Sequence, residues 1–282
     1  MAGTSGPGAG RATGAPRRRR KGWQPHPAPT HSPESTHRPA AVAARPSFGV
    51  DSPSLVIAAV GVTIALTFAG VFIGGPAGLR WSALFWLAAL GGLAVTTAMF
   101  LSSFRGKAAL WDEVLDGMDL RGDEQALDAG CGRGLVLVAL ARRVPEGHVT
   151  GVDVWRNRDQ SGNAPAATAL NADVAGVADR VTVTDGDVRR LPLPDGAFDV
   201  VTAGLVLHHL ATPTERKAAV GELVRVARPG GRVVVVDRVG PAELEAALRR
   251  AGAERVEVSG RRWLTYPPTR VVTAWCPAAP GS

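Results

Sequence analysis

One short stretch, Gln125 to Gly134, constrains the fold of this chain more than any other. A short apolar run ends in Asp128, and glycines follow at alternate positions, namely Gly130, Gly132 and Gly134. Glycines there let the backbone turn sharply and let a ligand lie against main-chain N–H groups at a helix N-terminus. Because a helix-like run follows at once, the pattern predicts a strand, a tight turn and a helix, which together begin a βαβ unit.

A second short apolar run, His148 to Val152, ends in Asp153. An acid at the end of the second strand of such a unit can bind both hydroxyls of a ribose. The acid that precedes the glycines, Asp128, would repel a pyrophosphate, so the turn suits a ligand with an amino group and no phosphate. An NAD-type oxidoreductase is therefore disfavoured, and the only tyrosine, Tyr266, forms no Tyr-x-x-x-Lys pair.

The glycine turn resembles the first motif of class I S-adenosylmethionine (SAM) methyltransferases. Similar blocks continue in the family's order at Val183–Asp187, Leu191–Val201, Val206–Leu210 and Arg225–Asp237. The resemblance covers about residues 110 to 276. It implies an α/β fold with a doubly wound, seven-stranded sheet whose last strand is antiparallel, and SAM as the cofactor.

The resemblance also implies roles for residues at the strand ends. Asp128 is expected near the SAM amino group, Asp153 at the ribose and Asp187 at the adenine amino group, while Val154 and Val188 pack beside the adenine. The alternatives are helix capping for Asp128 and Asp153 and an ordinary turn for Asp187. The predicted cofactor-binding set is Asp128, Gly130, Gly132, Gly134, Asp153, Val154, Asp187 and Val188.

No residue is assigned to catalysis, although His208 and His209 are candidates. They could act in acid–base chemistry, line the substrate pocket or have a structural role only, and Asp237 could orient a substrate from the same end of the sheet. The polar stretch Trp155 to Pro165 departs from the family pattern. It is either a lid or substrate-facing loop, or a surface insertion. No metal-binding spacing is present, and Cys131 is interpreted as a small filler between glycines.

The periodicity from Gly106 onward predicts alternating strands and helices. Strands are expected near 125–128, 148–152, 181–184, 198–203, 232–237, 254–259 and 269–275, and helices near 108–115, 134–143, 164–175, 214–227 and 241–251. The last two strands should form a hairpin that turns at Pro267-Pro268.

Residues 1–50 form a segment of distinct composition, rich in Pro, Gly, Ala, Ser, Thr and Arg, and are predicted to be a disordered basic arm. They contain eight Lys or Arg and one acid, so they carry the whole net charge of +7. The remaining chain is balanced, which argues against a nucleic-acid groove on its surface. The basic run Arg17 to Lys21 is a topology signal or lipid contact, a nucleic-acid contact, or solvated charge.

Residues 51–104 are predicted to form two transmembrane helices, at about 55–75 and 81–103, ahead of a methyltransferase domain at 105–282. Each span is uncharged and long enough to cross a hydrocarbon core of about 30 Å. The alternative is a buried hairpin in a soluble protein. Positive charge gathers in the arm and at Arg105 and Lys107, whereas the turn between the spans has only Arg80. The positive-inside rule then predicts a two-pass protein of the cell membrane with both termini and the catalytic domain in the cytoplasm.

The expected function is methyl transfer by in-line displacement from SAM to a small acceptor. No Asn-Pro-Pro-Tyr-type motif follows the fourth strand, where the chain reads Ala203 to Val206. This favours a small-molecule acceptor over an amide or a nucleobase, and the anchor favours an apolar one reached from the bilayer, such as a quinone or lipid precursor. The alternative is a SAM-binding membrane protein that senses or scaffolds without transfer.

Overall fold

The computed structural model describes residues 45–49, 51–74 and 78–278. The predicted arm therefore lies outside the described residues, except for residues 45–49. Those residues make defined hydrogen bonds to the α/β domain, among them Ser47 to Asn171 at 2.9 Å in each direction.

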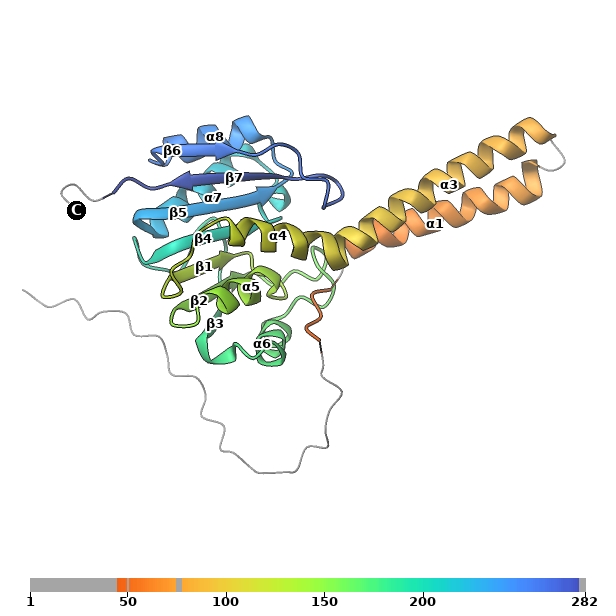
Figure 1. Cartoon of the computed structure of the whole chain (residues 1–282). Helices are drawn as coiled ribbons and strands as arrows, with labels where there is room; N and C mark the ends of the chain where they lie inside the picture. The colour runs from red at the N-terminus through yellow and green to blue at the C-terminus, as the bar shows by residue number, and fades with distance from the viewer. Residues whose placement is uncertain (1–44, 50, 75–77, 279–282) are drawn as a thin grey trace, which may run out of the picture. The chain divides into compact units, whose positions relative to one another are not determined.

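The described chain has two helices that precede a sheet with flanking helices (Figure 1). The helices are α1 (Pro53–Ala69), α3 (Leu79–Leu101), α4 (Lys107–Asp116), α5 (Leu135–Arg143), α6 (Pro165–Val174), α7 (Pro213–Val226) and α8 (Pro241–Arg250). Short turns are the π-helices η1 (Gly70–Gly74) and η2 (Ser102–Gly106) and the 3₁₀-helices η3 (Ala178–Arg180) and η4 (Leu207–His209). The strands are β1 (Gln125–Ala129), β2 (His148–Asp153), β3 (Val181–Asp185), β4 (Phe198–Gly204), β5 (Ala227–Asp237), β6 (Arg255–Val258) and β7 (Arg270–Trp275).

The seven strands form one sheet in the order β3-β2-β1-β4-β5-β7-β6. Strands β1 to β5 run parallel to one another, and β7 runs antiparallel to both β5 and β6. A central parallel strand is covered on both faces and is therefore apolar throughout. Val233 to Val236 of β5 fit this rule, since each is at most 1% exposed. The doubly wound sheet and its antiparallel last strand are as predicted.

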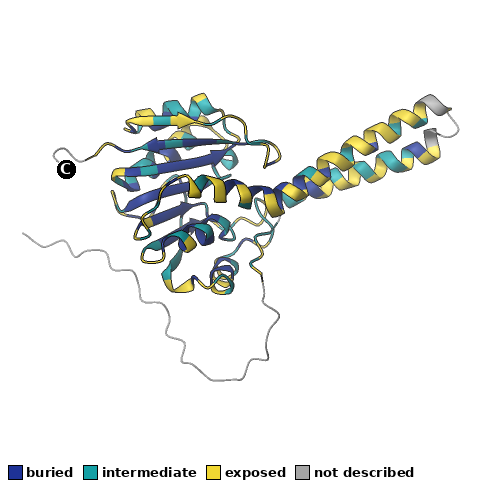
Figure 2. Ribbon diagram, in the orientation of Figure 1, coloured by how far each residue is buried: buried dark blue, intermediate teal, exposed yellow. Residues whose placement is uncertain are grey.

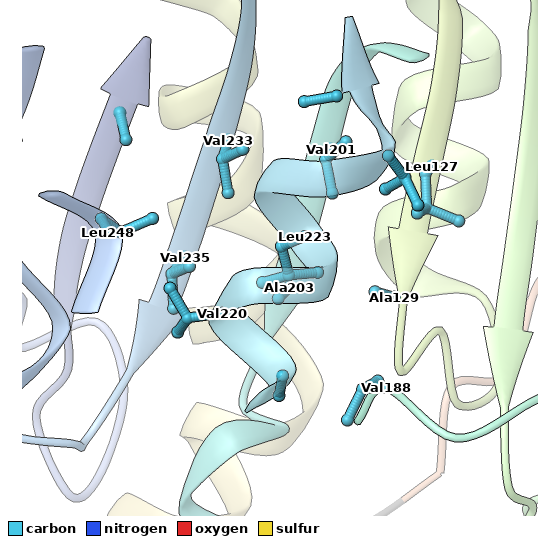
Figure 3. Close-up of a cluster of buried hydrophobic side chains, with 14 of the residues drawn as sticks. Leu127, Ala129, Val188, Val201, Ala203, Val220, Leu223, Val233, Val235 and Leu248 are labelled. Atoms are coloured by element: carbon cyan, nitrogen blue, oxygen red, sulfur yellow. The ribbon is translucent and has the colours of Figure 1, made fainter. Parts of the chain in front are cut away.

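Helices cover both faces of the sheet (Figure 1). On one face, α7 and α8 contribute Leu223 and Leu248 to a buried cluster with Leu127, Val201 and Val233 (Figure 3). On the other face, α4, α5 and α6 cover a second cluster that includes Trp111 and Leu137. The central strands β1, β2, β4 and β5 are mostly dark with burial in Figure 2, whereas the edge strands β3 and β6 are more exposed.

Helices α1 and α3 run side by side as a hairpin (Figure 1). A side chain on Gly92 would collide with Thr63, so this small residue lets the two helices approach closely. The outward apolar side chains are exposed (Figure 2), for example Ile57 at 71% and Leu87 at 64%. Both helices are long and apolar enough to cross a membrane, by length and composition alone.

One helix boundary differs from the sequence prediction. The helix expected near 108–115 is not separate, because α3 continues through η2 into α4. The run from the apolar helix into the α/β domain is therefore a continuous helical rod that widens to π geometry at Ser102–Gly106. Single π turns inside helices often accompany functional sites.

Candidate functional site

A cavity of about 330 Å³ lies at the carboxyl ends of the parallel strands. The strand order reverses between β1 and β4, and ligands of open α/β sheets bind at such a switch point. Its walls come from the ends of β1, β2 and β4, from the base of the helical hairpin and from the loop between β6 and β7. We call the wall at the glycine turn the cofactor end and the wall at the hairpin the acceptor end.

The glycine turn has the backbone conformation that its composition predicts. Gly130, Gly132 and Gly134 have φ angles of 77°, 52° and 84°, in the left-handed region that favours glycine. A side chain at Gly130 would collide with Val206, and one at Gly132 would collide with Gln160. Glycine at these positions therefore lets the turn pack closely against Val206 and Gln160, and Gly130 and Gly132 line the cavity.

Asp153 ties the end of β2 to this turn. One carboxylate oxygen accepts the N–H of Gly132 at 2.8 Å, and the other accepts the N–H of Trp155 at 2.7 Å and the side-chain amide of Asn163 at 3.2 Å. Asp153 is 9% exposed and lines the cavity. Its position at the cofactor end fits the predicted contact with ribose hydroxyls, which stays a prediction.

Asp128 is buried at the floor of the cavity, with 1% of its surface exposed. The hydroxyl of Thr202 donates to Oδ1 at 3.0 Å, whereas Oδ2 has no hydrogen-bond partner among the described residues. Burial raises the pKa of Asp128 to about 7, against the hydrogen bond from Thr202, and the charge of Asp153 adds to the rise. An unpartnered, buried carboxylate oxygen suits a cationic ligand, so the residues present fit the amino group of SAM.

The predicted adenine contacts also line the cavity. Val188 is 7% exposed and Val154 is 43% exposed. Asp187 is held by the guanidinium of Arg189, which is also bound to Glu215. The hydrogen bond from Arg189 lowers the pKa of Asp187 below its usual value. The sequence interpretation did not include Arg189, although a basic residue two positions after the acid was a visible signal.

The polar stretch Trp155 to Pro165 lies against the cavity, so it is not a remote surface insertion. Its Gln160 accepts the N–H of Arg133 at 2.8 Å and donates to the carbonyl of Phe48 at 2.9 Å. Asn163 holds Asp153, as described above. The sequence interpretation singled out this stretch but no residue within it, because its contacts join positions 10, 27 and 112 residues apart and follow no local pattern.

His208 and His209 both line the cavity, and their ring centroids are 4.0 Å apart. Nδ1 of His208 lies 3.1 Å from Oδ1 of Asp237, whose side chain is fully buried. Asp237 also accepts the N–H groups of Leu207 and Arg238. Although burial opposes ionisation, the His208 contact and the N–H groups of Val239 and Arg238 lower the pKa of Asp237. The carboxylate is therefore charged, which suits it to accept a hydrogen bond from Nδ1 of His208.

His209 differs from its neighbour. Burial and the proximity of His208 lower its pKa, so its ring is neutral near pH 7. Its Nδ1 lies 3.5 Å from Asp159 of the polar stretch.

The acceptor end is built by residues far apart in the sequence. Leu55 of α1, Met99 of α3 and Tyr266 of the β6–β7 loop line it. Lys107, 9% exposed in its side chain, contacts both carboxylate oxygens of Asp51 at 2.7 Å. The sequence analysis considers Lys107 only as a positive charge that sets the membrane topology, and it assigns no role to Asp51.

Among the described residues there is no cluster of three or more His, Cys, Asp or Glu side chains that could hold a metal ion. Cys131 is buried within the glycine turn, and burial raises the pKa of its thiol. The thiol is therefore neutral, in keeping with the small filler that the sequence predicted.

Comparison with known families identifies the type of domain. Residues 127–235 match the family model described as "Methyltransferase domain". The 27-O-demethylrifamycin SV methyltransferase of Amycolatopsis mediterranei is 35% identical over 155 residues, which cover 54% of this chain and 52% of that protein. A demethylmenaquinone methyltransferase of Staphylococcus aureus is 34% identical over 129 residues, which cover 45% and 48% respectively. This chain thus spans about half the length of these curated relatives.

Solved structures agree on the fold. The cyclase SpnF has a TM-score of 0.51 at 22% identity, covering 61% of this chain and 82% of that one. A putative O-methyltransferase from Nostoc punctiforme has a TM-score of 0.50 at 19% identity, covering 64% and 60%. The family match favours SAM over a nicotinamide cofactor. Residues 127–235 therefore match a methyltransferase domain, the sheet has the fold of the class I enzymes, and S-adenosylmethionine is the cofactor that this match indicates.

Proposed function

We propose that this chain is a membrane-anchored methyltransferase that transfers a methyl group to the oxygen of a small, apolar acceptor. The observation that carries this proposal is the composition of the cavity at the carboxyl ends of the strands. The unpartnered carboxylate of Asp128 lies at one end, and the His208–Asp237 pair and the base of the apolar hairpin lie at the other. The names of the Amycolatopsis and Staphylococcus relatives support a small-molecule acceptor.

SAM, when bound, supplies an electrophilic methyl group on a sulfonium centre. The glycine turn, Asp128 and Asp153 would hold it, and Val188 would pack against its adenine. Nε2 of His208 takes the proton of the acceptor hydroxyl, and Asp237 keeps the ring in the tautomer that can accept it. Tyr266 and Met99 help to exclude water from the acceptor end.

The hairpin is the proposed anchor. Most of the apolar residues of its two helices are exposed, whereas the core helix of a soluble protein would be mostly buried. The basic arm and Arg105 flank the hairpin, while its turn has only Arg80. The positive-inside rule supports a cytoplasmic catalytic domain in the cell membrane. SAM is made in that compartment.

Two experiments test this proposal. Membranes that contain the full chain are incubated with methyl-labelled SAM, and the product that carries the label is identified by mass spectrometry. If no product in the extract carries the labelled methyl group, the result would favour the alternative, a SAM-binding protein without transfer. In the second, a reporter active only outside the membrane is fused at Ser282 or between Pro76 and Leu79. The first fusion should be silent and the second active, and activity at Ser282 would contradict the topology.

A further inference from the structure

The loop between β6 and β7, residues 259–269, exposes large apolar side chains beside the hairpin. Trp263 is 71% exposed, Leu264 is 45% exposed and Tyr266 is 40% exposed. Clustered exposure of this kind on one loop marks an interaction surface. The same loop lines the cavity through Thr265, Tyr266 and Pro267.

Hydrogen bonds and an ion pair fix the backbone of the loop that carries these exposed side chains. The Thr265 hydroxyl is buried against that of Thr269 at 2.9 Å and accepts the N–H of Thr269 at 3.1 Å. Arg262 forms an ion pair with Glu113 of α4 at 2.7 Å. Trp263 and Leu264 are therefore presented outward by a fixed backbone.

The loop is fixed against one level of the helical rod. The N–H of Tyr266 donates to the Ser102 hydroxyl at 2.8 Å. A side chain on Gly106 would overlap the carbonyl of Leu264, so glycine there permits direct backbone contact. Both contacts fall within η2, at the domain end of α3.

This level coincides with the expected membrane surface. A hydrocarbon core of about 30 Å corresponds to about 20 helical residues at about 1.5 Å each. Counted from the exposed Trp81 at the far end of α3, the core ends near Leu101. Ser102 to Gly106, and the loop that contacts them, then lie at the depth of the lipid headgroups.

The charges around the loop fit the same partner. Arg105 and Arg261 are exposed; Arg105 precedes Gly106, which approaches Leu264, and Arg261 is two positions before Trp263. Trp and Tyr next to Lys or Arg is the composition that proteins place at a membrane interface, where the rings lie at headgroup depth and the cations meet anionic lipid.

We infer that residues 261–266 form a third membrane contact, in which Trp263 and Leu264 insert into the lipid interface. This inference rests on the proposed anchor. It places the mouth of the cavity, of which Tyr266 is part, at the level where an amphiphilic acceptor presents its polar head. We expect this surface to bind bilayers that contain anionic lipids.

The test uses the full chain in vesicles of phosphatidylcholine and phosphatidylglycerol. Leu264→Cys is labelled with an environment-sensitive nitrobenzoxadiazole, and Glu146→Cys, at an exposed site between α5 and β2, is the matched control. Both native cysteines are buried, and the unsubstituted chain serves as the labelling blank. The probe at residue 264 should emit at shorter wavelength than the control, and nitroxide lipids labelled near the headgroup should quench it more than mid-chain ones. Trp263→Asp in the same labelled chain should reduce that quenching.

Each other outcome overturns the inference. If the chain floats with the vesicles but the two probes emit alike, the loop does not touch lipid, although the anchor stands. A shift to shorter wavelength without nitroxide quenching would mean that the loop contacts another copy of the chain. If the chain does not float, the proposed anchor fails and the loop contact fails with it.

Discussion

The two ends of the cavity are built on different principles. At the cofactor end, backbone N–H groups and carboxylates lie at the ends of adjacent strands, within one βαβ unit. At the acceptor end, side chains come from α1, α3, η4 and the β6–β7 loop, which are far apart in the sequence. The comparison teaches that the cofactor site is built from residues of one local motif. The acceptor site, in contrast, is built by packing of residues that are far apart in the sequence.

The largest expected effect concerns the acceptor end. His208→Ala removes the proposed general base, so methyl transfer should fall by about 10²- to 10⁴-fold. SAM affinity, measured by calorimetry, should stay unchanged because the imidazole belongs to the other end. His208→Gln, which keeps a polar side chain of similar reach but no basic nitrogen, is the matched variant. A rate equal to that of the parent would remove His208 from the chemistry.

A somewhat smaller effect is expected at the cofactor end. Asp153→Ala removes the carboxylate that holds Gly132 and is predicted to bind the ribose. The loss of charge-assisted hydrogen bonds costs about 2–4 kcal/mol, so SAM affinity should fall roughly 30-fold or more. Asp173→Ala, on the exposed face of α6, is the control. Equal affinity in both variants would show that the ribose assignment is wrong.

The pH dependence of SAM binding sharpens the role of Asp128. Burial raises its pKa to about 7, so below that pH a proton must leave before the carboxylate can pair with a cation. Affinity should rise with pH and level off above about 7, with a change of up to about tenfold per unit below it. The sign for stability is opposite. A raised pKa stabilises the unliganded fold most below pH 3.8, and this contribution is lost as pH rises through about 7. Calorimetry from pH 5.5 to 8 checks the first point, and Asp128→Asn should flatten the profile.

The smallest effect tests whether the polar stretch belongs to the cofactor end. Gln160→Ala removes two neutral hydrogen bonds, to Arg133 and Phe48, that hold the chain over the glycine turn. Each such bond is worth about 0.5–1.5 kcal/mol, so SAM affinity should fall a few-fold while the rate at saturating SAM persists. Gln125→Ala, at the opposite end of β1, is the control. A loss of rate without a loss of affinity would instead assign the stretch to the acceptor end.

The sequence predicts the cofactor end of the cavity better than the acceptor end. The glycine turn, Asp153 and the apolar strands were predictable because their signals are local and their geometry is imposed by φ angles and strand periodicity. The pairing of His208 with Asp237 was not predicted, since residues 29 positions apart meet only after β5 takes its place beside β4. The contact of Tyr266 with Ser102 joins residues 164 positions apart, and no local pattern indicates it.

The continuity of α3 with α4 is a further case. The sequence shows an apolar span that ends near Ser103 and a separate amphipathic run, so two helices were the natural prediction. The residues between them, Ser102 to Gly106, contain no proline, and Arg105 is their only charged residue. Nothing in this segment ends the helix, and the chain continues through a π turn. Propensity alone could not choose between a loop and a widened helix at this point.

The central claim is that one cavity joins a cofactor end to an acceptor end, and one measurement tests it most directly. Full-length chain in its membrane is given SAM with a labelled methyl group, and cofactor binding and the label in lipid-extractable product are measured on the same sample. The account predicts binding and labelled product in the parent, binding without product in His208→Ala, and neither in Asp153→Ala at a SAM concentration near the parent's dissociation constant. Binding without any labelled product in the parent would contradict it, because the cavity would then hold SAM without transferring its methyl group.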